Sequence, residues 1–328
     1  MTRDLSQLSD ALRRVLPDGD GITGLRAFST GHSNETYLIE GLDQILRLPP
    51  SVAPLMPDSH DVIAQARIYE SLSRTADTPP VPGILFSCDD ASVLGDPFFV
   101  MARVPGEEIN DYLPQSWFAD ASPAQLEALC GKWMKAFCSL ANLAELDVLG
   151  SSVTPEDEVR RWQNMAREAD CAPLVASFDR LLTVPAPRSG APSPAHGDPK
   201  LANLMWSNRE LTAVLDWELA YNGEPLADLG YILAFFASDA REANKACGYD
   251  GMWQRDTIIA HWADMTGRDP SGIRWHEAAA IGKMGAIIAY GYNLYVSGKS
   301  DDARFLKWKE PIENNLSIMN IMLRSINA

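Results

Sequence analysis

The strongest constraint on the fold is a change of pattern near residue 104. Before it, short runs of apolar and β-branched residues alternate with only a few helical segments, which is typical of a sheet region. After it, apolar residues recur at intervals of three and four, which predicts helices. Val104, Pro105 and Gly106 separate the two regions. We therefore expect an α+β chain with a small N-terminal β-sheet lobe over 1–103 and a larger, mostly helical C-terminal lobe over 104–328.

The N-terminal region contains two predicted pairs of strands. Residues 35–41 and 44–48 are apolar runs around a Gly-Leu-Asp turn, which predicts a hairpin. Two further strands are expected near 83–87 and 97–103. Between the pairs, residues 61–74 carry apolar side chains at helical spacing, and a cluster of prolines ends that helix.

The C-terminal region begins its helices with clear start signals. Ser122 followed by proline, and Thr154 followed by proline, are each an N-cap residue before a proline in the first turn. Two short strands are expected at 202–206 and 213–217, and from about residue 225 the pattern is almost wholly helical.

Composition excludes several classes of function. The net charge of −16 and the pI near 4.7 disfavour binding to nucleic acid, which normally needs a basic surface. No stretch is long and apolar enough to span a bilayer, and the amphipathic start is expected to be a helix of the fold rather than a targeting segment. The five cysteines are scattered without C-x-x-C spacing, so we expect neither disulfides nor a zinc site, and a cytoplasmic location.

The densest cluster of reactive residues is the run HGDPKLAN over 196–203. Transfer of a phosphoryl group from ATP needs a carboxylate to accept a proton, oxygen ligands for Mg²⁺ and a cation near the moving phosphate. Asp198 is the candidate base, and Lys200 is close enough along the chain to reach the transferred group. His196 suits a supporting catalytic role. Asn203 offers a neutral oxygen to the metal ion.

Asp216 supplies the second candidate ligand for Mg²⁺. It ends the apolar run AVLD, where its carboxylate can reach the same cleft. Together, HGDPKLAN and VLDWE resemble the catalytic loop and the metal-binding strand of the aminoglycoside phosphotransferase and choline kinase family, which has a protein-kinase-like fold. The resemblance implies that Asp198 is the base, that Asn203 and Asp216 hold Mg²⁺, and that Asp228 is a buried carboxylate bracing the loop.

The same resemblance assigns a nucleotide-binding role to the N-terminal lobe. FSTGHSNETYLIE resembles the hairpin that covers the phosphates of ATP, with backbone amides at Gly31, His32, Ser33 and Asn34. Main-chain atoms at Met101 and Arg103 resemble the hinge that binds adenine.

Arg47 stands where kinases usually carry the lysine that binds the α- and β-phosphates. The best-aligned partner on the following helix is Gln65, where relatives have glutamate. Within the family, the Arg-x-Pro-Pro pattern at this strand resembles the kinase-like domain fused to some acyl-CoA dehydrogenases, so the arginine does not by itself imply inactivity.

The expected acceptor is the hydroxyl of a small molecule. Only eleven residues separate Asp216 from Asp228, which leaves no room for a peptide-docking segment. An aminoglycoside-like antibiotic and a hydroxyacyl-CoA or other metabolite alcohol stay open as acceptors. A nucleotide-binding pseudokinase with impaired catalysis is the alternative function, and a homodimer is also left open.

Overall fold

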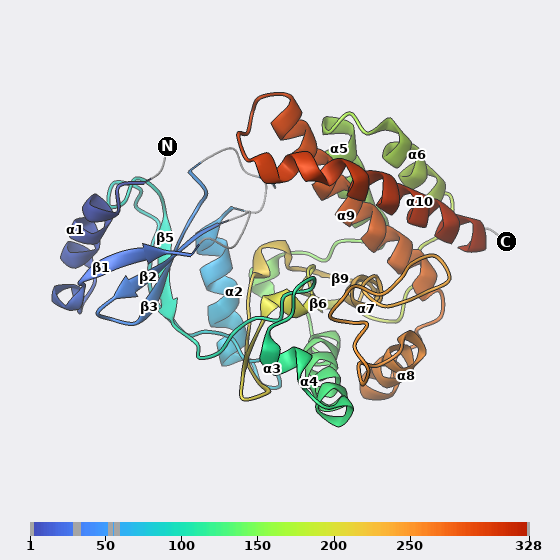
Figure 1. The fold of residues 1–328 in the computed structure, drawn as a ribbon, viewed down its shortest axis with the longest axis horizontal. Helices are drawn as coiled ribbons and strands as arrows, with labels where there is room; N and C mark the ends of the chain where they lie inside the picture. Colours follow the sequence, from blue (N-terminus) through green and yellow to red (C-terminus); the bar gives the residue numbers. More distant parts are fainter. Residues whose placement is uncertain (1–2, 29–33, 52–54, 56–59, 327–328) are drawn as a thin grey trace.

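The computed structural model describes residues 3–28, 34–51, 55 and 60–326, which form a sheet lobe and a helical lobe (Figure 1). The sheet is antiparallel, with the strand order β1-β2-β3-β5-β4. Its strands are β1 (Gly24–Ala27), β2 (Glu35–Glu40), β3 (Gln44–Leu48), β4 (Ile84–Cys88) and β5 (Phe98–Ala102).

Each face of the sheet is covered by one helix, α1 (Leu5–Val15) or α2 (Val62–Arg74). Successive side chains of a strand point to opposite faces. Accordingly Ile39, Leu46 and Val100 belong to the core beneath α1. Their neighbours Leu38, Ile45 and Phe99 pack with α2, in a core that continues into the helical lobe. Helix α2 therefore lies between the sheet and the rest of the molecule (Figure 1).

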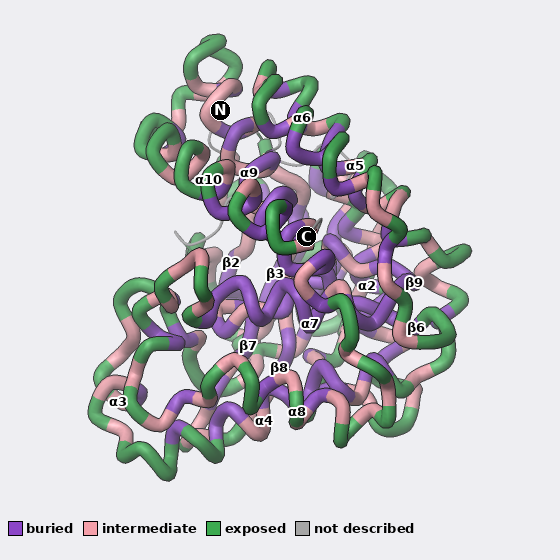
Figure 2. Tube along the Cα trace, turned by 90° about the vertical axis from the view of Figure 1, so that its right-hand side faces the viewer, coloured by how far each residue is buried: buried purple, intermediate pink, exposed green. Residues whose placement is uncertain are grey.

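The helical lobe is organised around α9 (Ile273–Val296), which packs against α5, α6, α7 and α10. Helix α7 is buried through most of its length (Figure 2). The other α-helices are α3 (Ser116–Ala119), α4 (Pro123–Ala141), α5 (Pro155–Glu168), α6 (Ala172–Leu181), α7 (Leu226–Leu233), α8 (Arg255–Thr266) and α10 (Lys309–Ile326). Short 3₁₀ turns are η1 (Gly19–Gly21), η2 (Asp147–Leu149), η3 (Leu201–Asn203), η4 (Trp217–Leu219) and η5 (Ala303–Trp308).

Helices α7 and α9 approach each other very closely at Gly230. A Cβ atom on Gly230 would lie 2.6 Å from the main-chain carbonyl carbon of His276, so no larger residue fits without moving a helix. The contact brings Asp228 of α7 and Lys283 of α9 to the two sides of one loop, residues 196–203. The fold thus positions this loop from two buried helices.

Two short strand pairs hold the ends of the same loop. Strand β6 (Ser193–Ala195) pairs with β9 (Tyr221–Gly223), and β7 (Leu204–Ser207) pairs with β8 (Glu210–Val214). Residues 196–203 therefore connect β6 to β7, and Asp216 lies in the connection from β8 to β9.

The expected α+β, two-lobed fold is confirmed, with three local corrections. Strand β8 spans Glu210–Val214 rather than 213–217, because Asn208 and Arg209 both adopt positive φ and close a tight two-residue hairpin. Residues 235–254 contain no α-helix, so the chain after 225 is less helical than expected. The short strands β1 and β9 are absent from the sequence prediction. None of the described helices combines the length and the apolar character needed to cross a membrane.

Candidate active site

The carboxylate of Asp198 is the centre of the site. Lys200 donates from Nζ to Asp198 Oδ2 over 2.7 Å, and Asn203 donates from Nδ2 to the same oxygen over 2.9 Å. A second bond from Asn203 Nδ2 reaches the main-chain oxygen of Asp198 at 2.8 Å. The loop therefore brings together three residues that the sequence singled out.

Asp198 is held in its ionised form. Burial acts to raise its pKa, but the Lys200 ammonium outweighs burial, and the pKa falls to about 2 with a contribution from the Tyr231 hydroxyl. The pKa of Lys200 is raised in turn, because Asp198 more than offsets the cost of burying the ammonium. At neutral pH the pair is a carboxylate and an ammonium ion. Such a carboxylate can orient a hydroxyl and receive its proton late in the reaction.

His196 supports the loop from inside the core. It is fully buried, and the main-chain N–H of Asp198 donates to its Nδ1 over 3.1 Å. Since Nδ1 accepts, the ring proton is on Nε2, which donates to the main-chain oxygen of Leu215 over 2.8 Å. Burial lowers the pKa of His196, so the ring is neutral.

Asp228 braces the loop, as the sequence resemblance implied. Its Oδ2 accepts from the main-chain N–H of His196 at 2.7 Å, and its Oδ1 accepts from that of Gly197 at 2.9 Å. Gly197 has φ +82°, and a Cβ there would lie 2.3 Å from the main-chain oxygen of Leu219. Only glycine satisfies both requirements.

Asp216 is tied to the same loop through its neighbour Leu215. The main-chain N–H of Leu215 donates to Asn203 O at 2.8 Å, while Leu215 O accepts from His196. Asp216 itself adopts a left-handed conformation with φ 59°, and its main-chain N–H donates to the Tyr69 hydroxyl at 3.2 Å. The two segments that carry the candidate metal ligands are therefore fixed to each other.

Arg47 extends from β3 into the site. Its side chain donates from Nη2 to Asp216 Oδ1 at 2.9 Å and from Nη1 to Thr36 Oγ1 at 2.8 Å. The contact with Gln65 Oε1 is only 3.5 Å long, at the limit of a hydrogen bond. Burial opposes the charge of Arg47, yet Asp216 raises its pKa overall. The charge partner of Arg47 is thus Asp216, and Gln65 makes a marginal contact.

The other candidate nucleotide-binding residues are only partly observed. Gly31, His32 and Ser33 lie outside the described residues. Asn34 follows them, and its side chain bonds Glu218 Oε2 at 3.1 Å and His60 Nδ1 at 3.3 Å.

At the expected hinge, Met101 is buried inside β5, paired with both β3 and β4. Arg103 follows the strand, and its side chain donates to Asp43 Oδ1 at 2.6 Å. The Arg103 side chain is therefore occupied by a contact within the sheet lobe. Any contact of this segment with adenine would have to use main-chain atoms.

The donor atoms present suit Mg²⁺ held jointly with phosphates. Among the described residues no cluster of three or more His, Cys, Asp or Glu is able to hold a metal ion by itself. Asn203 uses its Nδ2 on Asp198, so its Oδ1 is the atom left to accept a cation. The Asp216 side chain is 40% exposed and accessible to an ion. One carboxylate and one amide oxygen, completed by phosphates, match the preference of Mg²⁺ for hard oxygen ligands.

Comparison with known sequences decides the class of the chain. The sequence profile of the phosphotransferase enzyme family matches residues 24–269. The chain belongs to this family. The expectation of a phosphotransferase is thereby confirmed.

Individual relatives agree with this membership. This chain is 32% identical to mouse acyl-CoA dehydrogenase family member 10 over 246 residues. The match covers 69% of this chain and 22% of the mouse protein. The chain thus spans about a fifth of that relative.

Two solved structures share the fold of the phosphotransferase. A Ralstonia eutropha protein assigned as an aminoglycoside phosphotransferase superimposes with a TM-score of 0.76 at 21% identity, over 98% of both chains. A thermostable mutant of another aminoglycoside phosphotransferase, solved with AMP-PNP and hygromycin B, gives a TM-score of 0.61 at 16% identity over 98% of both chains. At these identities the structures show the fold alone.

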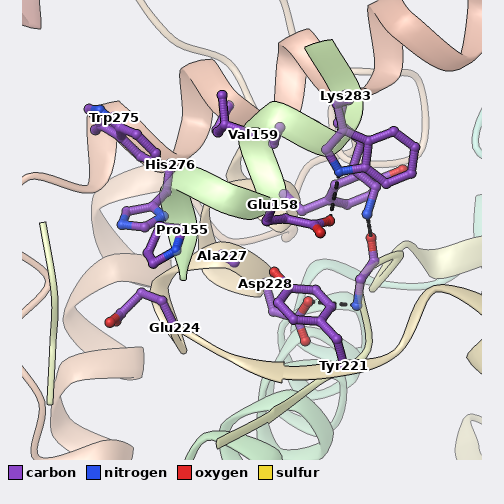
Figure 3. A pocket seen from close by; sticks show the side chains of 15 residues that line it. Pro155, Glu158, Val159, Tyr221, Glu224, Ala227, Asp228, Trp275, His276 and Lys283 are labelled. Carbon is purple, nitrogen blue, oxygen red and sulfur yellow. Dashed lines mark hydrogen bonds between the residues drawn. The ribbon is translucent and has the colours of Figure 1, made fainter. Parts of the chain in front are cut away.

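Sequence reasoning missed several residues that hold the phosphotransferase site. Trp133 Nε1 donates to Pro199 O at 3.0 Å. Lys283 Nζ donates to Gly197 O at 2.6 Å, and Figure 3 shows Lys283 in the lining of the adjacent pocket. For Lys283 a signal was present, since it is the sole charged residue between Glu277 and Lys299. A lone charge in a long apolar helix is costly to bury and so marks a specific contact.

Proposed function

We propose that this phosphotransferase moves the γ-phosphoryl group of ATP to a hydroxyl of a small molecule, with Asp198 as the base. The observation that supports the proposal is the convergence on Asp198 Oδ2 of Lys200 at 2.7 Å and Asn203 at 2.9 Å. A base, a cation and a metal-binding amide thus occupy one loop, and Leu215 anchors Asp216 to it. These are the groups that phosphoryl transfer requires.

In this reaction the acceptor oxygen forms a bond to the γ-phosphorus, while the bond from that phosphorus to the leaving ADP oxygen breaks. Asp198 orients the hydroxyl and receives its proton. Lys200 stabilises the negative charge on the moving group. Asn203 and Asp216 would hold Mg²⁺, which neutralises phosphate charge when bound.

The sheet lobe is proposed to bind the nucleotide. Arg47 would contact the α- and β-phosphates, and its guanidinium is already directed toward Asp216. Main-chain amides at Gly31, His32, Ser33 and Asn34 would cover the phosphates, and the main chain at Met101 and Arg103 would bind adenine. On this proposal residues 1–103 form the nucleotide-binding lobe, and 104–328 supply the catalytic loop and the acceptor site.

A metabolite alcohol, such as a hydroxyacyl thioester, is the acceptor we favour over an aminoglycoside. The support is a comparison of sequence identities. This chain is 32% identical to the mouse acyl-CoA dehydrogenase family member, but only 16% identical to the aminoglycoside phosphotransferase solved with hygromycin B. The aminoglycoside-like acceptor stays a candidate, because the fold is shared with such enzymes.

A pseudokinase is the second candidate function. It is favoured by one observation, the pairing of Arg47 with Asp216 where kinases use a lysine and a glutamate. In a pseudokinase this pair would persist when nucleotide binds, and no group would be transferred.

The deciding experiment measures transfer of labelled phosphate from Mg-ATP to hydroxyacyl thioesters, amino alcohols, macrolides and aminoglycosides. We expect turnover with at least one class, and a loss of about 100- to 10,000-fold in Asp198→Asn. Thermal stabilisation by Mg-ATP should survive in this variant. Stabilisation without turnover on any acceptor, including water, would establish the pseudokinase. Equal turnover in Asp198→Asn would remove Asp198 from its role.

A further inference from the structure

Lys283 is a buried lysine beneath the catalytic loop (Figure 3). It lies on α9, is 6% exposed, and donates from Nζ to the main-chain oxygen of Gly197 at 2.6 Å. The ammonium also lies 4.7 Å from the ring centroid of Trp162 and 5.4 Å from that of Tyr231. These contacts fix the head group in one place, because rings on two other helices enclose it.

This arrangement is costly if it serves stability alone. Burial lowers the pKa of Lys283, against the attraction of Glu158, Asp198 and Asp228. Among the described residues, the hydrogen bond that Lys283 makes is to a peptide carbonyl rather than a carboxylate. An apolar side chain at such a position is often as stable or more stable. The cost therefore indicates a role for the ammonium at Gly197.

The peptide unit that Lys283 contacts is the one that enters Asp198. Its carbonyl oxygen, Gly197 O, accepts from Lys283, and its N–H, on Asp198, donates to His196 Nδ1 at 3.1 Å. The preceding peptide N–H, on Gly197, donates to Asp228 at 2.9 Å. Because the peptide unit is planar, fixing both of its polar groups fixes the direction in which the Asp198 side chain leaves the backbone.

A small cavity beside the loop reduces the cost of burying the Lys283 head group. The cavity has a volume of about 40 Å³, and its lining includes Lys283 together with the acids Glu158, Glu224 and Asp228. A volume of roughly 10–15 Å³ admits one water molecule, so this cavity has room for more than one near the polar groups. Water and acids together reduce the penalty of burying the ammonium.

We infer that Lys283 is a positioning residue of phosphoryl transfer, which sets the orientation of Asp198 through the 197–198 peptide. The inference rests on the proposed function. It assigns to α9, far from the catalytic loop in sequence, a direct effect on the chemical step. Lys283 touches the loop and not the reacting groups, so its removal should lower kcat and leave nucleotide binding intact.

The test compares Lys283→Met with Glu277→Gln. Methionine keeps the length and apolar stem of lysine but removes the ammonium. Glu277 is a fully buried charge on the same helix that pairs with Arg255 of α8, so its substitution perturbs α9 without touching the loop. Mg-ATP hydrolysis and amide hydrogen exchange of residues 196–203 are measured for both variants and the wild type.

For Lys283→Met we expect kcat to fall by about 10- to 100-fold, because small misplacements of a catalytic group cost about that much. The KM for Mg-ATP should stay within about twofold, and the Gly197 and Asp198 amides should exchange about tenfold faster. Glu277→Gln should change neither kcat nor loop exchange. Unchanged exchange and kcat in Lys283→Met, or equal effects in both variants, would overturn the inference.

The two readouts separate this inference from the proposed function. If the wild type transfers phosphate from Mg-ATP to neither water nor any acceptor, the proposed function fails, whereas faster exchange in Lys283→Met alone still supports positioning of the loop. If Lys283→Met does not fold, Lys283→Gln, which keeps an N–H donor, replaces it. Failure of both to fold would make Lys283 a requirement of the fold and would contradict a positioning role.

Discussion

Arg47 of β3 and Asp216, 169 residues later in the chain, form an ion pair of 2.9 Å across the two lobes. The Arg47 side chain is 12% exposed and that of Asp216 is 40% exposed, so the arginine is largely buried and the aspartate is accessible to solvent. Under the proposed function these side chains bind phosphate and Mg²⁺. Binding of Mg-ATP would therefore replace the Arg47–Asp216 ion pair with two new contacts, Arg47 to phosphate and Asp216 to Mg²⁺.

Arg47→Met should weaken nucleotide binding. A hydrogen bond to a charged group contributes about 1.5–3 kcal/mol, which corresponds to about a 10- to 150-fold rise in the KM for Mg-ATP. Arg47→Lys should recover part of the lost nucleotide affinity, because lysine keeps the positive charge but lacks the two-pronged hydrogen bonding of the guanidinium. Steady-state kinetics and Mg-ATP thermal shifts measure both. Arg26→Met removes an exposed pair with Glu40 on the same sheet and is the matched control. An unchanged KM in Arg47→Met would exclude a phosphate contact.

The catalytic loop was predictable because its residues are close in sequence. Asp198, Lys200 and Asn203 lie within six positions, so a single turn brings them together wherever the loop is placed. Likewise the strand boundaries of β2 and β3 followed from local apolar runs. Local spacing determines local geometry, and this part of the site needs no knowledge of the tertiary fold.

The partners that come from distant segments were not predictable. Alignment with the family indicated Gln65 as the partner of Arg47. In the folded chain the packing of the two lobes brings Asp216 closer to the Arg47 guanidinium than Gln65 is. Lys283 is marked in the sequence as a lone charge in an apolar helix, but its partner Gly197 is 86 residues away, and nothing in α9 alone identifies it. The start of β8 was misplaced because the tight turn before it requires a positive φ at Arg209, a conformation that arginine rarely adopts.

His196→Leu should impair the loop by leaving two buried groups without partners. The Asp198 N–H and the Leu215 carbonyl would each lose a hydrogen bond, at a combined cost of about 2–6 kcal/mol in the free energy of unfolding. We expect kcat to fall more than tenfold. Urea denaturation and Mg-ATP hydrolysis check this. The control is His261→Leu, because His261 lies in the helical lobe and makes an edge-to-face ring contact with Trp253. Equal effects of the two substitutions would refute a specific role.

Asp111 predicts a pH-dependent stability. Burial raises its pKa from 3.8 to about 6, with Lys200 opposing and Asp198 adding to the shift. Between these values the folded chain binds a proton that the unfolded chain has released. The contribution of Asp111 to stability is therefore greatest below about pH 4 and is lost as the pH rises through 6.

Asp111→Asn removes this dependence, because the amide does not ionise. At about 1.4 kcal/mol per pKa unit, the free energy of unfolding of the variant relative to wild type should rise by about 3 kcal/mol between pH 4 and pH 8. Urea denaturation at the two pH values measures the difference, and Asp120→Asn, at an exposed site after α3, should show none. A difference that is the same at both pH values would mean that Asp111 is ionised throughout. Its burial beside Asp198 and Lys200 would then be compensated by a partner that neutralises it.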